Sequence, residues 1–283
     1  MLNPQRTINC KGRLVDLSQP KIMGILNVTP DSFFDGGKYT SEKNMLQQVE
    51  KMLAEGADLI DVGGMSSRPG AEVISVEEEL GRVLPVVRAI HKHFPDALIS
   101  IDTVRSEVAR QTVEAGAALV NDISAGRFDD QLYQTVASLG VPYILMHMQG
   151  QPSNMQDAPE YEDVITEVLD FCIAQLKELR ALGIKDVIID PGFGFGKSVE
   201  HNYQLLQNMH AFQILDLPVL AGVSRKSMIC KLLKVDPAQA LNGSTALHMI
   251  ALQQGASILR VHDVKEARQV VQLWEMLENS TIQ

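Results

Sequence analysis

The sequence of 283 residues is poor in cysteine and holds no long hydrophobic run. Its three cysteines, Cys10, Cys172 and Cys230, lie far apart and match neither a metal-binding spacing nor a disulfide framework. No apolar stretch approaches the roughly 20 residues that cross a bilayer, and the first residues lack the apolar segment of a secretory signal. We therefore expect a cytoplasmic protein with free thiols and no membrane partner.

Positive charge is also in short supply, since 25 lysines and arginines stand against 35 aspartates and glutamates and the net charge is −10. This balance argues against a nucleic-acid partner, because phosphate backbones require a basic face. A local basic pocket for a small anion remains compatible with it. Apolar residues make up 45% of the chain, which is enough for the large core of a soluble globular protein.

Short apolar runs recur along the chain, and helix-like stretches separate them. The runs are continuous rather than alternating, as expected for strands that are buried on both faces. They cover residues 21–29, 59–64, 97–103, 119–124, 142–148, 186–192, 217–224 and 257–263. The glycines that precede four of these runs are typical of helix C-termini, and they are Gly56, Gly116, Gly140 and Gly255.

Eight strand–helix repeats favour an α/β fold, a single-domain (β/α)8 TIM barrel. An open doubly wound sheet would alternate strands and helices in the same way and is the rival architecture. We expect residues 1–20 to form a short cap on the barrel floor and residues 21–283 to form the barrel. No linker, low-complexity segment or charge block divides the chain.

Nearly every apolar run ends in a side chain that can form hydrogen bonds or carry charge. These residues are Asn27, Asp61, Asp102, Asn121, Asp122, His147, Asp190, Ser224, Arg225, Arg260 and His262. Polarity often resumes at a strand end, but eight such ends would converge on the carboxyl face of a barrel, where barrel enzymes build their sites. The two acids enclosed in apolar sequence, Asp102 and Asp190, would need partners there, and a ligand is one way to supply them.

The residue types indicate a ligand with a flat, donor-rich heterocycle and an anionic tail. Acceptor and amide groups suit the ring edge, and cationic groups suit the anion. The first set is Asp102, Asn121 and Asp190, and the second is Arg68, Arg225, Lys226, Arg260 and His262. Ser227 should open a helix whose free N–H groups form an anion site, with a plain N-cap as the alternative. Segment 190–197 lacks the Walker A spacing, so its glycines indicate close approach to a flat ligand.

Eight ordered motifs resemble those of the dihydropteroate synthases. They are NVTPDSF, GG-x-S-x-RPGA, ISIDT, NDI, LMHMQG, DPGFGFGK, GVSRKSM and RVHDV, and they span residues 21 to 265. The resemblance implies a homodimeric enzyme that condenses 6-hydroxymethyl-7,8-dihydropterin pyrophosphate with p-aminobenzoate and uses Mg2+. Methyltetrahydrofolate methyltransferases share the pterin-binding barrel and form one alternative. An aldolase-type barrel with Lys226 as a Schiff-base amine and a non-catalytic pterin-binding barrel are the others.

The resemblance also implies a role for each matching residue. It assigns catalysis to Asp102, Lys226, Arg260 and His262. It assigns the pterin to Asp102, Asn121, Met146, Asp190, Gly222 and Lys226. It assigns the pyrophosphate to Asn27, Arg68, Arg260 and His262, with Asn27 as the Mg2+ ligand. It assigns p-aminobenzoate to Thr29, Pro30, Ser67, Arg68, Pro69, Phe195, Lys226 and Ser227.

Two loop segments depart from the family pattern at three positions. Phe34 stands where a small polar residue is usual, Met65 where glutamate is usual, and Ser67 where threonine is usual. Ser67 keeps the hydroxyl group. The departures therefore bear on loop packing and sulfonamide affinity rather than on the reaction.

Overall fold

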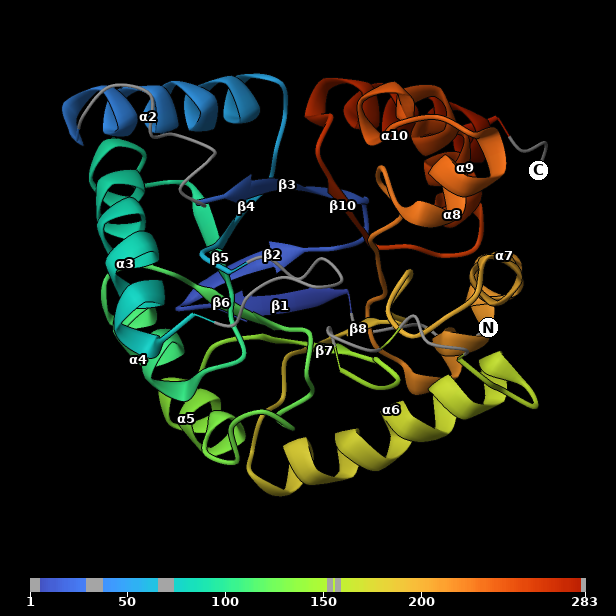
Figure 1. Ribbon diagram of the computed structural model, residues 1–283, viewed down its shortest axis with the longest axis horizontal. Coiled ribbons are helices and arrows are strands. Elements are labelled where there is room, and N and C mark those ends of the chain that lie inside the picture. The colour runs from blue at the N-terminus through green and yellow to red at the C-terminus, as the bar shows by residue number, and fades with distance from the viewer. Residues whose placement is uncertain (1–5, 29–37, 66–73, 152–154, 156–158, 281–283) are drawn as a thin grey trace.

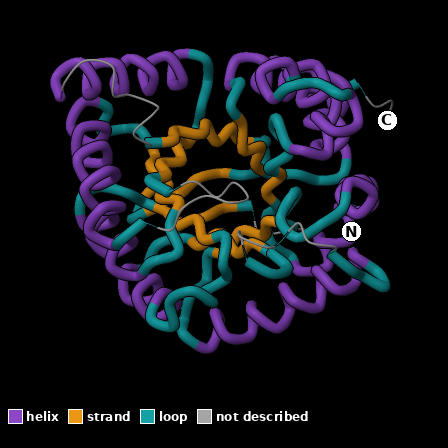
Figure 2. Tube along the Cα trace, in the orientation of Figure 1, coloured by secondary structure: helices purple, strands orange, loops and turns teal. Residues whose placement is uncertain are grey.

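The computed structural model describes residues 6–28, 38–65, 74–151, 155 and 159–280, with only the backbone for residues 38–41. Eight parallel strands form a ring, and helices cover its outside (Figure 2). The strands of the ring are β3 (Lys21–Asn27), β4 (Leu59–Gly63), β5 (Leu98–Asp102), β6 (Leu119–Asp122), β7 (Tyr143–Met146), β8 (Val187–Asp190), β9 (Leu220–Ala221) and β10 (Ile258–Val261).

Hydrogen bonds link the strands in the order β8-β7-β6-β5-β4-β3-β10-β9. An isolated parallel bridge between Ile189 and Val219 then joins the two edge strands. The ring is closed at that point by this one bridge. The predicted (β/α)8 barrel is confirmed, and the open doubly wound sheet is excluded.

Helices connect the strands and pack against their outer faces (Figure 1). They are α2 (Lys38–Ala54), α3 (Val76–His93), α4 (Ser106–Glu114), α5 (Leu132–Leu139), α6 (Val164–Ala181), α7 (Val199–Gln207), α8 (Ser227–Leu233), α9 (Leu241–Gln253) and α10 (Val264–Asn279), with the 3-10 helices η1 (Met209–Leu215) and η2 (Pro237–Gln239). The four glycines predicted to end helices all have positive φ, between 62° and 128°, which glycine adopts without strain. None of the helices in the described ranges is both apolar enough and long enough to cross a membrane.

Side chains along each strand point alternately to the helices and to the interior, and the inward ones fill the barrel. The first inward residues form an apolar floor, which consists of Met23, Leu59, Leu98, Leu119, Ile144, Ile188, Leu220 and Ile258. An antiparallel hairpin of β1 (Thr7–Cys10) and β2 (Arg13–Asp16) packs Ile8, Cys10 and Val15 against this floor. The hairpin therefore lies on the floor of the barrel, and the division into a cap, residues 1–20, and one barrel domain, residues 21–283, stays a prediction.

The buried side chain of His248 on α9 is a polar group that destabilises the core. Its side chain is 1% exposed, and neither ring nitrogen has a hydrogen-bond partner within the part of the chain that the structure describes. Burial lowers its pKa to about 4, although Asp263 opposes the shift. We expect His248→Leu to raise the free energy of unfolding by about 1 to 2 kcal/mol, because an unsatisfied polar group leaves the core.

The same substitution should change how stability depends on pH. The unfolded chain takes up the His248 proton near the ordinary value of 6.5, whereas the folded chain takes it up only near 4. Wild-type stability should therefore fall as the pH falls through this window, and His248→Leu should lose that component. Urea unfolding at several pH values measures it, with His93→Gln as a control at an exposed histidine. Identical pH dependence in wild type and His248→Leu would contradict the prediction.

Candidate active site

Beyond the apolar floor, the inward positions become polar at the carboxyl ends of the strands. Two residues past a floor residue, β4, β6, β8 and β10 carry Asp61, Asn121, Asp190 and Arg260, and β5 carries Asp102 four residues past its own. Side chains in a strand alternate with a period of two, so all five point into the barrel like the floor residues. The predicted convergence of strand-end residues is confirmed for these positions.

Arg260 links two acids across the interior. Its Nε donates to Asp61 Oδ2 at 2.6 Å, and its Nη2 donates to Asp102 Oδ2 at 2.7 Å. Asn121 Nδ2 donates to the same Asp61 oxygen at 3.0 Å. We call Asp61, Asp102, Asn121 and Arg260 the ionic network. Because Asp61 is fully buried, the charge of Arg260 has to balance its own, and Asn121 adds a neutral hydrogen bond.

Burial shifts both acids that were predicted to bind the heterocycle. It raises the pKa of Asp102 to about 7, a rise that Arg260 opposes and Asp61 increases. Burial also raises the pKa of Asp190, although the Gly192 N–H donates to its Oδ1 at 2.7 Å and Lys226 opposes the rise. Additional N–H donors from a ligand would stabilise the ionised form of either acid.

An apolar wall borders the ionic network. Its members are Val104, Ile123, Met146, Met148, Met155 and Phe195, and Met65 packs against them. Lys226 Nζ lies 4.1 Å from the centre of the Phe195 ring, which is a cation–π contact. Burial, and next the charge of Arg260, lower the pKa of Lys226 to about 8. The site therefore combines apolar side chains for the face of a ring with acids and a cation for its polar edge.

The residues predicted to bind the anion differ in exposure and in their partners within the protein. Asn27 ends β3, Ser227 begins α8 as predicted, and His262 directly follows β10; all three are exposed. Arg225, by contrast, donates from Nε to Asp263 Oδ2 at 2.9 Å. This ion pair occupies part of the Arg225 guanidinium, and the role of Arg225 toward the anion stays a prediction.

Two predicted strand-end residues point away from the interior. Asp122 accepts hydrogen bonds from the Ser124 N–H at 2.7 Å and the Tyr143 hydroxyl at 2.6 Å. His147 Nδ1 lies 2.9 Å from Lys197 Nζ, behind the apolar wall. Each is one position out of phase with the inward residue before it, Asn121 or Met146, which explains why strand-end polarity alone misplaced it.

Gly192 and Gly196, two of the three glycines in 190–197, have a role other than the predicted one. A Cβ on Gly192 would lie 1.8 Å from the His147 carbonyl oxygen, and one on Gly196 would lie 2.3 Å from that of Gln149. Both have positive φ, 74° and 62°. These glycines allow two loops of the protein to touch, rather than a ligand to approach.

Several predicted residues lie outside the described residues, and some described residues were missed. The first group is Thr29, Pro30, Phe34, Ser67, Arg68 and Pro69. Asp61 was expected among the converging strand-end residues but was assigned no binding role, although its spacing from Leu59 places it inward, and Lys197 was not predicted at all. Met65, which departs from the family pattern, packs on the apolar wall.

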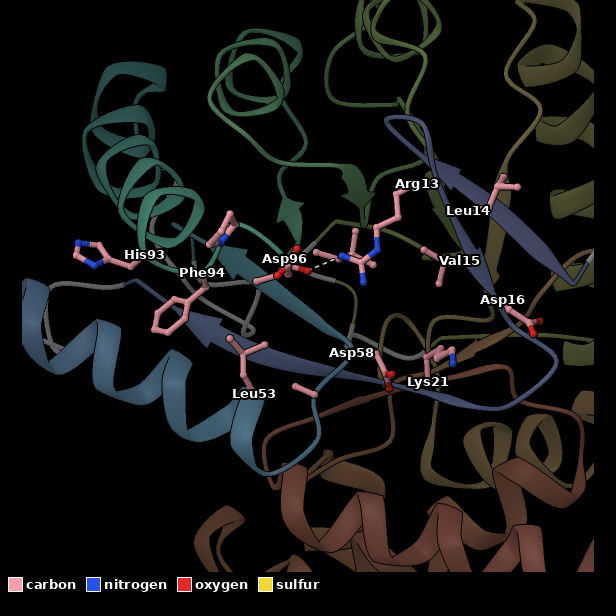
Figure 3. Close-up of a pocket in the computed structure, with 14 residues that line it drawn as sticks. Arg13, Leu14, Val15, Asp16, Lys21, Leu53, Asp58, His93, Phe94 and Asp96 are labelled. Carbon is pink, nitrogen blue, oxygen red and sulfur yellow. Dashed lines mark hydrogen bonds between the residues drawn. The ribbon is translucent and has the colours of Figure 1, made fainter.

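A cavity of about 600 Å³ lies at the other end of the barrel (Figure 3). Its lining includes Lys21 and Leu98, which are the first residues of β3 and β5. Arg13 of the hairpin also lines it. Arg13 Nη1 donates to the Asp96 carbonyl at 2.5 Å. Barrel enzymes place their chemistry at the carboxyl ends of the strands, so we do not assign the active site to this cavity.

Comparisons with known proteins agree with the geometry. The model of the family described as "Pterin binding enzyme" matches residues 23–262. Dihydropteroate synthase of Escherichia coli (strain K12) is 48% identical over 267 residues, which cover 94% of each chain. A crystal structure of Yersinia pestis dihydropteroate synthase with a sulfonamide drug has a TM-score of 0.91 at 45% identity, covering 97% of this chain and 100% of that one. Xanthomonas albilineans dihydropteroate synthase with 4-aminobenzoic acid has a TM-score of 0.90 at 42% identity, with 98% and 99% covered. The chain therefore belongs to the pterin-binding enzymes and, among them, to the dihydropteroate synthases.

Proposed function

We propose that the ionic network and the apolar wall bind the two substrates of the dihydropteroate synthase reaction. In this reaction p-aminobenzoate displaces pyrophosphate from 6-hydroxymethyl-7,8-dihydropterin pyrophosphate. One observation carries the proposal: inward acids and an amide meet the apolar wall at the carboxyl end of the barrel. Asp190 of β8 stands opposite Met146 of β7 in the sheet register, so an acid and a wall residue lie side by side. Such a site accepts the N–H donors of a pterin and covers its faces.

The pterin is assigned to Asp102, Asn121, Met146, Asp190, Gly222 and Lys226. A Cβ on Gly222 would lie 4.0 Å from Asp190 Oδ2, so the glycine leaves open space beside this acid. The charges of Asp190 and Asp102 both act on the pKa of Lys226, which means that the ammonium group lies near both acids. A ring held between them would meet two acceptors and one donor.

The p-aminobenzoate is assigned to Phe195, Lys226 and Ser227 among the described residues. Phe195 is 7% exposed and belongs to the apolar wall, where it can pack against an aryl ring. Lys226 and the exposed Ser227 at the start of α8 offer donors to a carboxylate. The assignment of Thr29, Pro30, Ser67, Arg68 and Pro69 rests on the motifs of the sequence alone.

The pyrophosphate is assigned to Asn27, Arg68, Arg260 and His262. Arg260 uses Nε and Nη2 in the ionic network, so Nη1 is the nitrogen we assign to the anion. His262 Nδ1 lies 3.1 Å from Ser224 Oγ, and this contact orients the imidazole ring of His262. In the sequence, His262 follows Arg260 by two positions. These residues would stabilise the negative charge that develops on the leaving group.

Mg2+ fits Asn27 as a single protein ligand. No group of three or more His, Cys, Asp or Glu side chains among the described residues is placed to hold a metal ion. The exposed amide oxygen of Asn27 suits a cation that keeps several waters and takes other ligands from substrate phosphates. When bound, the ion would supply positive charge to the pyrophosphate.

The chemistry that these residues support is electrostatic. The C–O bond to pyrophosphate breaks while the pterin donates electron density, the arylamine nitrogen forms the new C–N bond, and its proton passes to solvent. Asp102, when ionised, stabilises the positive charge on the pterin, and Arg260 with His262 stabilises the leaving charge. The apolar wall keeps away water that would compete with the amine. An arylamine is itself a nucleophile, so the assignment includes no general base.

Asp190→Asn tests this proposal. We expect it to weaken binding of the pterin pyrophosphate by about two orders of magnitude, because an acceptor that faces the ring is lost at a buried position. Calorimetry gives the dissociation constant, and a coupled assay gives pyrophosphate release that depends on p-aminobenzoate. Asp170→Asn, at an exposed position of α6, is the control. Unchanged pterin affinity in Asp190→Asn would refute the assignment, and trapping of Lys226 by borohydride would favour the aldolase alternative.

We also propose that the enzyme is a cytoplasmic homodimer. Exposed apolar side chains gather on α8 and α10, and they are Leu232, Leu233, Leu273, Met276 and Leu277. Both helices pack against α9 on one side of the barrel (Figure 1). Patches of this kind commonly mark an interface between subunits. Light scattering of the purified protein gives the mass that decides the point.

A further inference from the structure

Lys197 carries a buried positive charge behind the apolar wall. Its side chain is 2% exposed, and it forms no ion pair with a carboxylate in the described ranges. Burial lowers its pKa to about 7, although Asp190 opposes the shift. A buried cation without a paired acid is unfavourable unless its hydrogen bonds are satisfied. The hydrogen bonds of its ammonium group therefore have to offset the cost of burying Lys197.

The ammonium group of Lys197 joins two loops that follow neighbouring strands. We call residues 147–151 the β7 loop and residues 191–198 the β8 loop. Within the β8 loop, Nζ donates to the carbonyl oxygens of Gly192 at 3.0 Å and Phe195 at 3.1 Å. In the β7 loop, it lies 2.9 Å from His147 Nδ1. An ammonium group has three donors, and these three acceptors use them all.

Further contacts hold the β8 loop in its position next to the β7 loop. Gly192 approaches the His147 carbonyl so closely that a Cβ would not fit. Asn202 of α7 is 1% exposed, accepts a hydrogen bond from Gly194 N–H at 2.7 Å and donates to the Ser198 carbonyl at 2.6 Å. The Tyr161 hydroxyl donates to the Gly196 carbonyl at 2.7 Å. Lys197 is thus the central contact of a set that holds the β8 loop from behind.

The opposite side of the same two loops faces the site. The β8 loop carries Phe195, and the β7 loop carries Met148, two positions after Met146 of β7; all three belong to the apolar wall. Lys197 bonds the backbone carbonyl of Phe195 itself. The distance between Phe195 and the two methionines therefore depends on the lysine whose ammonium group contacts Phe195 in one loop and His147, the residue between the methionines, in the other.

We propose that Lys197 is a positioning residue for p-aminobenzoate, which sets the width of the slot between Phe195 and the methionines Met146 and Met148. This inference rests on the proposed assignment of Phe195 to p-aminobenzoate. Of the residues assigned to the pterin, Met146 lines this slot and Asp190 precedes the β8 loop, whereas Asp102 and Asn121 stand on β5 and β6 and bond to Arg260 or Asp61. Lys197 should consequently affect one substrate more than the other.

The test is Lys197→Met, which keeps the length of the side chain and removes the charge and all three donors. We expect KM for p-aminobenzoate to rise about 10- to 100-fold, the usual effect of losing a supporting contact behind a binding residue. The dissociation constant of the pterin pyrophosphate should rise less than this KM does, because Asp102 and Asn121 are held by contacts to Arg260 and Asp61, and only Asp190 among the polar pterin partners on the strands lies near Lys197. Steady-state kinetics and calorimetry measure the two constants.

A core substitution away from the loops separates positioning from a general loss of stability. Ile90→Ala on α3 removes a fully buried side chain and should lower the melting temperature without altering the ratio of the two constants. Asn202→Ala loosens the same loop without removing the lysine, and it should reproduce the p-aminobenzoate effect if Lys197→Met fails to fold. The proposal is overturned if folded Lys197→Met retains the wild-type KM for p-aminobenzoate, or if Ile90→Ala raises this KM relative to the pterin dissociation constant as Lys197→Met does.

Phe195→Ala distinguishes failure of the inference from failure of the assignment beneath it. If Phe195→Ala raises KM for p-aminobenzoate and Lys197→Met does not, Phe195 keeps its role and the lysine is only a structural residue. If Phe195→Ala leaves this KM unchanged, the aryl ring binds elsewhere. The slot is then not the p-aminobenzoate site, and the positioning role of Lys197 falls with it.

Discussion

Arg260→Leu is expected to reduce kcat/KM for the pterin pyrophosphate by about 10²- to 10³-fold, as loss of a preorganised charge at the reacting group does. The fold should suffer as well. Arg260 donates to Asp61 and Asp102, and removal of one partner from a buried ion pair costs about 3 to 5 kcal/mol. Urea unfolding measures the stability, and steady-state kinetics with each substrate varied in turn measure the activity.

A double variant separates the two effects. Asp61→Asn combined with Arg260→Leu removes the buried acid that the single variant leaves unpaired, so it should recover part of the stability. It should not recover the activity, because the charge facing the pyrophosphate is still absent. An Arg260→Leu enzyme that changed only KM for p-aminobenzoate would show that Arg260 does not serve the pyrophosphate.

Asp102→Asn is the second substitution for which we expect a large effect. The asparagine keeps the shape of the side chain but has no charge to stabilise the positive pterin. We expect kcat to fall by about 10²-fold or more, in the range found when one electrostatic contact to a reacting group is removed. Single-turnover kinetics at saturating pterin pyrophosphate isolate this step. Full turnover with unchanged pterin affinity would show that Asp102 has neither role.

The pH profile gives a second measure of Asp102. Burial raises its pKa to about 7, so the carboxylate that the reaction requires is lost as the pH falls below that value. In the wild type, kcat/KM for the pterin substrate should therefore fall on the acid side of about pH 7, since this quantity reports groups of the free enzyme. Asp102→Asn should lack this acid limb. An acid limb of equal midpoint in the variant would assign the titration to another group.

The fold was predictable because the strands are marked in the sequence twice. Their apolar runs are continuous, as burial on both faces requires, and glycines such as Gly116 and Gly140 end the helices before them. The inward face was predictable in part. The phase from Leu59 to Asp61 and from Leu119 to Asn121 places both polar residues inside, whereas strand-end polarity alone wrongly included His147.

The pairing inside the site was not predictable. Arg260 and Asp61 are 199 positions apart, and only the register around the ring brings them together. The ion pair between Arg225 and Asp263 was not predictable either, because 38 positions separate the two residues. Lys197 ends a glycine-rich motif that also suits a ligand loop, and nothing in its neighbours shows that the side chain turns back into the protein.

The single bridge between Ile189 and Val219 makes one seam of the barrel weaker than the others. β9 has only two residues, whereas β3 and β4 are paired over five positions. Local opening should therefore cost least free energy along this seam, and amide hydrogens there should exchange earliest among the strands of the ring. Asp190 stands at one edge of the seam, and Gly222 and Lys226 follow the strand at the other. A pterin bound between them would contact residues on both sides of the seam. The substrate itself would then stabilise the part of the barrel that has the fewest backbone hydrogen bonds between neighbouring strands.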